Sequence, residues 1–199
     1  MLRSPIPDPD VSRGRRVAAV GEIALIERVA RGDRDAFAAL YLAYHPRLTR
    51  FLDRVTRRPQ LVEEVLNDTM LVVWRKAQTF NFRSQLSTWI FGIAYRRALK
   101  ALTRVDDAVD FDPDSAVDLE HPGPDMLAQQ RECSALLDRA LAELSADHRA
   151  VIQLTYYEGC SCKEIAAILE CPVDTVKTRM FHARRRLRRL IEHAGGADA

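Results

Sequence analysis

Residues 161–193 read SCKEIAAILECPVDTVKTRMFHARRRLRRLIEH, and this stretch decides the fold. Ser161 and Glu164 form a capping box, in which the serine hydroxyl accepts from the Glu164 amide and the carboxylate reaches back. The box predicts a short helix over 162–170. A tight turn with a proline follows, and the remaining residues predict a long helix over 173–193. Two helices joined in this way form a helix-turn-helix.

The second helix of this motif is strongly basic, with seven basic side chains against two acidic ones. Such a helix fits the major groove of DNA, where its first turns contact base edges and arginines contact phosphates. A solvated basic helix end is the alternative interpretation. The candidates for base readout are Lys177, Thr178, Phe181 and His182, and those for phosphate contact are Arg179, Arg184, Arg185 and Arg188.

The rest of the chain also shows the three- and four-residue spacing of apolar side chains that is typical of helices. Asp33 can cap a helix over 34–56, and Pro46 inside it predicts a kink or break. In a helix over 61–77, the spacing places Leu66 inward. No alternating strand pattern occurs in the sequence, so the predicted fold class is all-α. Further helices are expected over 85–103, 126–144 and 146–157.

Charge is unevenly distributed along the 199 residues, although 30 basic and 28 acidic side chains leave a formal charge of only +2. Residues 82–104 carry +5, residues 105–126 carry −8 and residues 173–193 carry +5. The acidic stretch is poor in apolar residues and contains three prolines, which predicts a flexible linker. We therefore expect a disordered leader (1–20), an N-terminal helical bundle (21–104), an acidic linker (105–126), a C-terminal helix-turn-helix domain (127–193) and a tail (194–199).

Aromatic and basic side chains alternate in 82–104, and no acidic residue interrupts them. This mixture is typical of surfaces that bind single-stranded nucleic acid, where bases stack on aromatic side chains and basic side chains contact the phosphate backbone. The same aromatics also suit a helical core, so the residues alone leave both interpretations open. The residues are Phe82, Arg83, Trp89, Phe91, Tyr95, Arg96, Arg97 and Lys100.

No motif of an enzyme is present, because the sequence lacks a glycine-rich phosphate loop, paired histidines and an activated nucleophile. We expect no catalytic residue, no cofactor and no metal. Four cysteines without a secretory signal or an apolar run that could span a bilayer predict reduced thiols in a cytoplasmic protein. A zinc or redox site at Cys160, Cys162 and Cys171 is the alternative, although their spacing matches no standard zinc motif.

Three segments resemble the bacterial sigma-70 family, specifically the short extracytoplasmic-function (ECF) RNA polymerase sigma factors. VEEVLNDTMLVVWRKA (62–77) is similar to the family's core-binding helix. FRSQLSTWIFGIAYRRALK (82–100) is similar to its −10 element region, and YYEGCSCKEIAAILECPVDTVKTRMFHARRRLRRL (156–190) to its −35 reader. Their order and spacing also match the family. The resemblance implies sigma region 2 over 21–104 and sigma region 4 over 127–193.

The resemblance implies a non-enzymatic subunit that binds core polymerase and promoter DNA and promotes strand opening. Docking on the clamp helices of the largest polymerase subunit is implied for Glu63, Glu64, Leu66, Asn67 and Asp68. The −10 element is implied for Phe82, Arg83, Ser84, Trp89, Ile93, Arg96, Arg97 and Lys100, with the loop 80–85 receiving a flipped base. The −35 element is implied for Lys177, Thr178, Arg179, Phe181, His182 and Arg185.

Other partners follow from the same resemblance: the flap of the second largest polymerase subunit and an anti-sigma factor, with no membrane insertion and a monomeric free state. The sequence departs from the family at Arg96, where Asn is common, and at Thr155 and His182, where Arg is frequent. The promoter sequence therefore does not transfer. A helix-turn-helix transcriptional regulator that acts without core polymerase is the alternative function.

Overall fold

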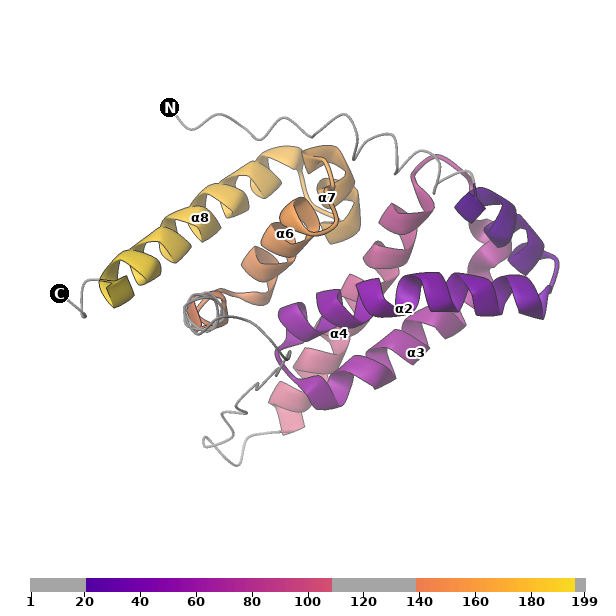
Figure 1. Ribbon diagram of the computed structural model, residues 1–199, viewed down its shortest axis with the longest axis horizontal. Helices are drawn as coiled ribbons and strands as arrows, with labels where there is room; N and C mark the ends of the chain where they lie inside the picture. The colour runs from indigo at the N-terminus through magenta and orange to yellow at the C-terminus, as the bar shows by residue number, and fades with distance from the viewer. Residues whose placement is uncertain (1–20, 109–138, 196–199) are drawn as a thin grey trace, which may run out of the picture.

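The computed structural model describes residues 21–108 and 139–195, and all regular structure in these ranges is helical, as predicted. Figure 1 shows two groups of helices that lie against each other, α2 to α4 with a helical segment at 21–30, and α6 to α8. The helices are α2 (Arg34–Thr56), α3 (Pro59–Lys76), the 3-10 helix η1 (Ala77–Thr79), α4 (Leu86–Ala108), α6 (Ala146–Tyr156), α7 (Cys162–Leu169) and α8 (Val173–Gly195). Within the described ranges, no helix is long and apolar enough to cross a membrane.

Two helices are longer than predicted. α4 continues to Ala108, so residues 105–108 of the predicted linker are helical. α8 continues to Gly195, past its predicted end at 193. The predictions for 1–20, 109–138 and 196–199, which include the leader and most of the linker, fall outside the described residues.

Short polar side chains begin the helices where the sequence predicts them. Asp33 Oδ1 accepts hydrogen bonds from the amides of Asp35 and Ala36, each at 3.0 Å, which satisfies donors at the start of α2. At the start of α7, Ser161 Oγ accepts from the Glu164 amide at 3.3 Å. The Glu164 carboxylate accepts from the Ser161 amide at 2.7 Å, which confirms the capping box.

α2 runs through Pro46 without the predicted break. A proline removes one backbone hydrogen bond from a helix interior, which weakens the helix locally. On either side of it, Tyr44 and Leu48 have exposed fractions of 0%. Tertiary packing of these side chains holds α2 continuous at a position where local propensity favours an interruption.

One hydrophobic cluster extends through both groups of helices. Phe51 of α2 and Phe91 of α4 meet edge to face, with 5.1 Å between their ring centroids. Leu154 of α6 and Ile165 of α7 belong to the same cluster and are fully buried. α4 packs against α7, and α2 packs against α6. We call these two contacts the interdomain interface, because they join the two predicted domains into one packed body.

The middle of α4 is buried on all sides. Residues 90–95 are buried without exception, because α2 and α3 cover one side of the helix and α7 covers another. A Cβ atom on Gly92 would lie 3.8 Å from the Cα atom of Ile168 in α7. A methyl group would therefore fit at ordinary contact distance, whereas a larger side chain at this position would meet the backbone of α7.

Candidate nucleic-acid interface

The exposed face of α8 brings together five of the six residues predicted to bind the −35 element. On the opposite face, Val176 and Ala183 are fully buried against the rest of the domain. The Phe181 ring is 60% exposed and contacts the His182 ring at a centroid distance of 5.5 Å. A large aromatic side chain held in solvent on a basic helix is typical of a binding surface. The five residues are Lys177, Thr178, Phe181, His182 and Arg185.

The first turn of α8 orients two of these side chains. Lys177 Nζ lies 2.9 Å from Asp174 Oδ1, and this hydrogen bond raises the pKa of Lys177 above its ordinary value. The Thr178 hydroxyl donates to the Asp174 carbonyl oxygen at 2.9 Å. Exposed ion pairs contribute little to stability, so a phosphate can replace Asp174 as the partner of Lys177 at small cost.

Arg179, the sixth predicted residue, faces the interdomain interface instead. Its guanidinium forms an ion pair with Asp147 of α6 and donates to Cys171 Sγ at 3.8 Å. From α4, the Tyr95 hydroxyl donates to the same Asp147 carboxylate. Burial raises the pKa of Tyr95, and the bond to Asp147 raises it further, so the hydroxyl remains a donor. Asp147 thus links α4, α6 and α8.

The loop 80–85 holds an aromatic ring in solvent. Phe82 has a left-handed backbone with φ of 58°, which is rare for a bulky residue, and is 52% exposed. Its ring meets the edge of Phe80 at 4.9 Å, and Phe80 in turn contacts Trp89 at 5.3 Å. Arg83 and Ser84 beside it are exposed. The left-handed backbone of Phe82 and the neighbouring rings of Phe80 and Trp89 therefore hold this part of the predicted −10 surface in solvent.

The remaining predicted −10 residues, on α4, are only partly accessible. Ile93 is 6% exposed and packs in the shared core, which contradicts a place on an open DNA surface. Arg96 Nη1 lies 2.5 Å from Oε1 of Glu170, which follows α7 in the helix-turn-helix. Lys100 is exposed. The structure thus leaves the loop residues and Lys100 open, pairs Arg97 with Asp68 of α3, and places Ile93 and Arg96 at the interdomain interface.

α3 carries the residues predicted to dock on core polymerase. Glu63, Glu64, Asn67 and Asp68 form one exposed face of this helix. Leu66 is fully buried, so its assignment to the docking face is wrong for this structure. Helical geometry explains the correction, because Leu66 points inward with the buried Val62 and Met70, four positions before and after it.

Each exposed residue of this face has a polar neighbour. Two of the partners are arginines of α4, so the docking face and the predicted −10 helix share ion pairs. Three of the four contacts lie at 3.1 Å or more. The contacts are Tyr41 Oη to Asn67 Oδ1 at 3.1 Å, His45 Nε2 to Glu63 at 3.7 Å, Arg104 Nη2 to Glu64 at 2.7 Å and Arg97 Nη1 to Asp68 at 3.7 Å.

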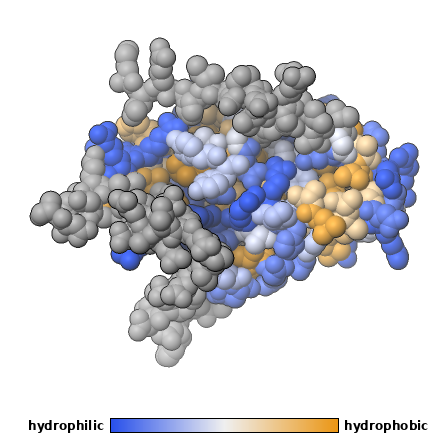
Figure 2. Space-filling model, viewed as in Figure 1, coloured by the Kyte–Doolittle hydropathy of each residue, from blue (hydrophilic) through white to orange (hydrophobic). Residues whose placement is uncertain are grey.

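Apolar side chains are also exposed on the N-terminal bundle. Leu42 of α2 is 73% exposed, Leu71 of α3 43% and Ile23 in the segment 21–30 41%. Figure 2 shows a hydrophobic patch over α2 on a face that is otherwise mostly hydrophilic. Patches of this kind are typical of protein docking surfaces.

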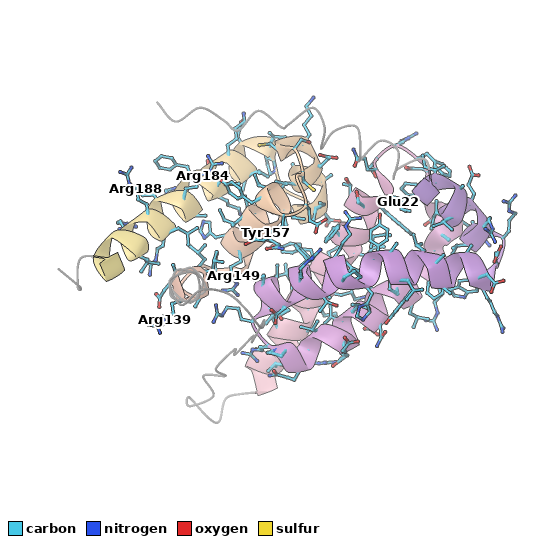
Figure 3. All side chains as sticks on the ribbon, in the orientation of Figure 1. Glu22, Arg139, Arg149, Tyr157, Arg184 and Arg188 are labelled. Atoms are coloured by element: carbon cyan, nitrogen blue, oxygen red, sulfur yellow. The ribbon has the colours of Figure 1, made fainter. Side chains whose placement is uncertain are left out.

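Three polar residues that the sequence did not single out lie in the interdomain interface. Arg47 of α2 donates to Glu158, which follows α6, and Arg149 of α6 donates to the carbonyl of Val55 in α2. In Figure 3, Arg149 and Tyr157 lie between α6 and α2, while Arg184 and Arg188 lie on α8, where the Arg184 guanidinium is 5.6 Å from the centroid of the Tyr156 ring of α6. The partners are 111 and 94 residues apart in the chain, so no local pattern indicates them.

The cysteine cluster shows no metal-site geometry. Cys160 is buried, Cys162 is exposed and Cys171 is half-buried. In the part of the chain that the structure describes, no group of three or more metal-ligating side chains comes together.

Two family models match the sequence, one in each group of helices. Residues 40–107 match the family model Sigma-70 region 2, and residues 134–187 match the model Sigma-70, region 4. The RNA polymerase sigma-H factor of Pseudomonas aeruginosa is 30% identical over 180 residues, which cover 84% of this chain and 92% of that protein. The ECF RNA polymerase sigma-E factor of Escherichia coli K12 is 32% identical over 170 residues, which cover 80% of this chain and 88% of that protein.

Solved structures show the same fold. The sigma factor RpoE of Bartonella quintana, in complex with the anti-sigma factor NepR, has a TM-score of 0.63 and 29% identity over 78% of this chain and 96% of that one. CnrH, in complex with the cytosolic domain of CnrY, has a TM-score of 0.65 and 23% identity over 87% of this chain and 98% of that one. The chain therefore belongs to the sigma-70 family and is an RNA polymerase sigma factor of the ECF type.

Proposed function

We propose that this sigma factor uses three separate surfaces to start transcription: the outer face of α8, the loop 80–85 with α4, and the polar face of α3. One observation carries the proposal: each surface keeps exposed side chains of the required chemistry on a different helix or loop. Promoter DNA and core polymerase can therefore be bound at the same time.

The outer face of α8 would enter the major groove of the −35 element. Lys177, Thr178, Phe181 and His182 lie in the first three turns, which are the turns that reach base edges in helix-turn-helix proteins. Arg185 follows on the same face and would contact a phosphate. His182, a shorter and more weakly charged side chain than arginine, would set a preference different from that of relatives with arginine there.

The loop 80–85 would receive a flipped base of the −10 element. Extrusion of a base costs a few kcal/mol, which stacking on an aromatic ring can offset. Phe82 is already held outside the core by its left-handed backbone, with Arg83 and Ser84 next to it. Trp89, Arg96, Arg97 and Lys100 would line the adjoining DNA along α4.

The polar face of α3 would dock on the clamp helices of the largest polymerase subunit. Glu63, Glu64, Asn67 and Asp68 supply acceptors, and the exposed Leu71 adds apolar area beside them. The C-terminal domain would contact the flap of the second largest subunit. The assignment of 21–104, with the helical residues 105–108, to region 2, of 109–126 to a linker and of 127–193 to region 4 is part of this proposal.

We further infer that an anti-sigma factor regulates the chain. The RpoE structure contains the anti-sigma factor NepR, and RpoE is 29% identical to this chain. The sigma factor itself would be a non-catalytic, monomeric subunit that acts in the cytoplasm, where RNA polymerase works.

Transcription in vitro from a library of random promoters, with core polymerase and this chain, tests the proposal. The selected promoters should share a −35 and a −10 element. Lys177→Ala and His182→Ala should change only the −35 preference, and Phe82→Ala should impair strand opening. Arg34→Ala, at an exposed arginine outside the three surfaces, is the matched control. Failure to initiate at any promoter would refute the proposed function.

A further inference from the structure

An acidic residue lies at the start of the basic helix proposed to read the −35 element. Asp174 is in the first turn of α8, and its side chain is 89% exposed. Lys177 and Thr178 follow it by three and four positions, and residues at these spacings share one face of a helix. Asp174 therefore lies on the outer face of α8, one turn before the residues proposed to contact bases.

The carboxylate of Asp174 is directed along this face. Its Oδ1 atom accepts a hydrogen bond from Lys177 Nζ at 2.9 Å, and the lysine side chain is 64% exposed. This bond and the positive charge of Lys177 lower the pKa of Asp174 below its ordinary value, so the carboxylate is ionised at neutral pH. Asp174 therefore offers a ligand hydrogen-bond acceptors and no donor.

Helix stability alone does not require an acid on this side of α8. An acid in the first turn is favourable because it faces the positive end of the helix dipole. Any side of a helix meets that requirement, as Asp35 does in the first turn of α2, outside the three proposed surfaces. On a face that meets DNA, the same charge repels phosphates and lowers the affinity for every sequence. A carboxylate is favourable there only where a base donates a hydrogen bond to it.

The chemistry of the major groove decides which base a carboxylate can contact. Cytosine presents its N4 amino group there, which is a donor. Guanine presents two acceptors, and thymine presents an acceptor and a methyl group. Adenine presents an amino group beside N7, an acceptor that would repel the second carboxylate oxygen. A carboxylate at a base edge therefore favours cytosine over the other three bases.

Lys177 complements Asp174, because its donors suit the O6 and N7 acceptors of guanine. A lysine ammonium group has three donors, so one can stay on Asp174 while another reaches the base. Three residues along a helix span about 4.5 Å, and neighbouring base pairs are about 3.4 Å apart. The two side chains can therefore contact the same base pair or two adjacent base pairs.

We propose that Asp174 is a specificity-determining residue, which accepts a hydrogen bond from N4 of a cytosine in the −35 element. This cytosine lies within one base pair of the base that Lys177 contacts. The inference rests on the proposed role of α8 in −35 binding. Part of the selectivity comes from rejection, because O6 of guanine or O4 of thymine at that position would face a negative charge.

Transcription in vitro tests the assignment, with core polymerase, the full-length chain and a promoter library whose −35 element is randomised. The original chain should favour cytosine about tenfold over thymine or guanine at one position. Asp174→Asn, whose amide suits N6 and N7 of adenine, should shift that position to adenine. Asp174→Ala should remove the preference there, and positions more than one base pair away should keep theirs. Asp35→Asn, the same change at an exposed acid in the first turn of α2, is the control.

A Lys177→Ala background separates direct contact from an effect that passes through Lys177. If Asp174 contacts the base itself, Asp174→Asn should still shift the same position from cytosine to adenine in that background. The preference for guanine beside it should be lost. Absence of the shift in the Lys177→Ala protein would show that Asp174 only orients the lysine, which would overturn the assignment.

Two further results would overturn the proposal. Asp174→Asn could raise initiation equally at every −35 sequence, which would show that the acid only repels phosphates. The control could shift the same position, which would show that the effect is not local to α8. Initiation with unchanged preferences in both Asp174 variants refutes this inference alone. Failure to initiate at any promoter refutes the proposed function, and this inference with it.

Discussion

Arg96 of α4 and Glu170 of the helix-turn-helix form an ion pair across the interdomain interface, with 2.5 Å between Nη1 and Oε1. The side chains are 46% and 65% exposed, so water screens the pair and its contribution to stability is small. Its main effect is on Arg96, whose charge is directed at a carboxylate and not at DNA. Glu170 holds this position with a left-handed backbone, with φ of 51°.

Glu170→Gln should therefore release Arg96 without unfolding the protein. We expect the free energy of unfolding to change by less than about 1 kcal/mol. The affinity of the free protein for single-stranded DNA, measured by fluorescence anisotropy, should rise. Arg96→Ala should leave stability equally unchanged but lower that affinity. A Glu170→Gln protein that binds DNA no better than the original would show that the pair does not restrain Arg96.

Gly92 offers a steric test of the contact between α4 and α7. A methyl group there would sit at ordinary contact distance, 3.8 Å from Ile168 Cα and 3.5 Å from Arg96 Nη1. Gly92→Ala should keep the domains together and stabilise α4 by up to about 1 kcal/mol, because alanine favours the helix. Gly92→Leu should force α7 away and enlarge the particle in small-angle scattering. Equal scattering curves for the two variants would contradict this account.

The capping box at the start of α7 should stabilise the helix-turn-helix. Ser161→Ala removes the hydroxyl that accepts from the Glu164 amide and should lower the free energy of unfolding by about 1 kcal/mol. Ser161→Asp retains an acceptor at the same position and is the control. Denaturant unfolding followed by circular dichroism measures both. A loss of equal size in the two variants would show that the cap is not the cause.

Leu66 and Asn67 are neighbours on α3 with opposite roles. Leu66 is fully buried, so Leu66→Ala should lower the free energy of unfolding by about 2–5 kcal/mol. Leu66→Met, which nearly conserves the volume, should lower this free energy much less. Asn67→Ala loses one exposed hydrogen bond from Tyr41 and should change stability by less than about 1 kcal/mol. Only Asn67→Ala should weaken binding to core polymerase in a pull-down of folded protein. The reverse pattern would move the docking face to another side of α3.

His148, beside the interdomain contact of Asp147, should make stability depend on pH. Burial lowers the pKa of His148 below its ordinary 6.5; Asp147 acts against this shift, while His182 and Arg179 add to it. The unfolded chain then binds the proton more tightly than the folded protein. The stabilising contribution is complete above about pH 6.5 and is lost as the pH falls through the folded pKa. The unfolding free energy should therefore fall less on acidification in His148→Gln, and identical pH profiles would contradict this.

Local interactions explain which parts of the structure the sequence predicts. The caps at Asp33 and Ser161 depend on residues two or three positions away, so a short motif identifies them. The inward position of Leu66 follows from helical spacing alone, and it is confirmed. The resemblance to relatives assigned the same residue to a docking face, because a matching segment of sequence does not separate the two sides of a helix.

Long-range contacts explain what the sequence does not predict. The sequence predicts two domains and does not indicate whether they touch, yet Ile93 is buried in a core that both share. Arg47 and Glu158 find each other across 111 residues, and nothing near either side chain indicates the other. The continuity of α2 through Pro46 also depends on long-range contacts, since packing against distant helices holds the helix together there.

Arg47 contacts Glu22 before α2, the ring of Phe91 in α4 and Glu158 after α6. The two halves of the chain, although each matches its own family model, are therefore not exchangeable modules. A chimera that receives the C-terminal half of a relative without an acid at this position would retain the helix-turn-helix but leave the half-buried Arg47 without its carboxylate partner. A chain that has Arg47 in its N-terminal half therefore needs a carboxylate at the position of Glu158 in its C-terminal half.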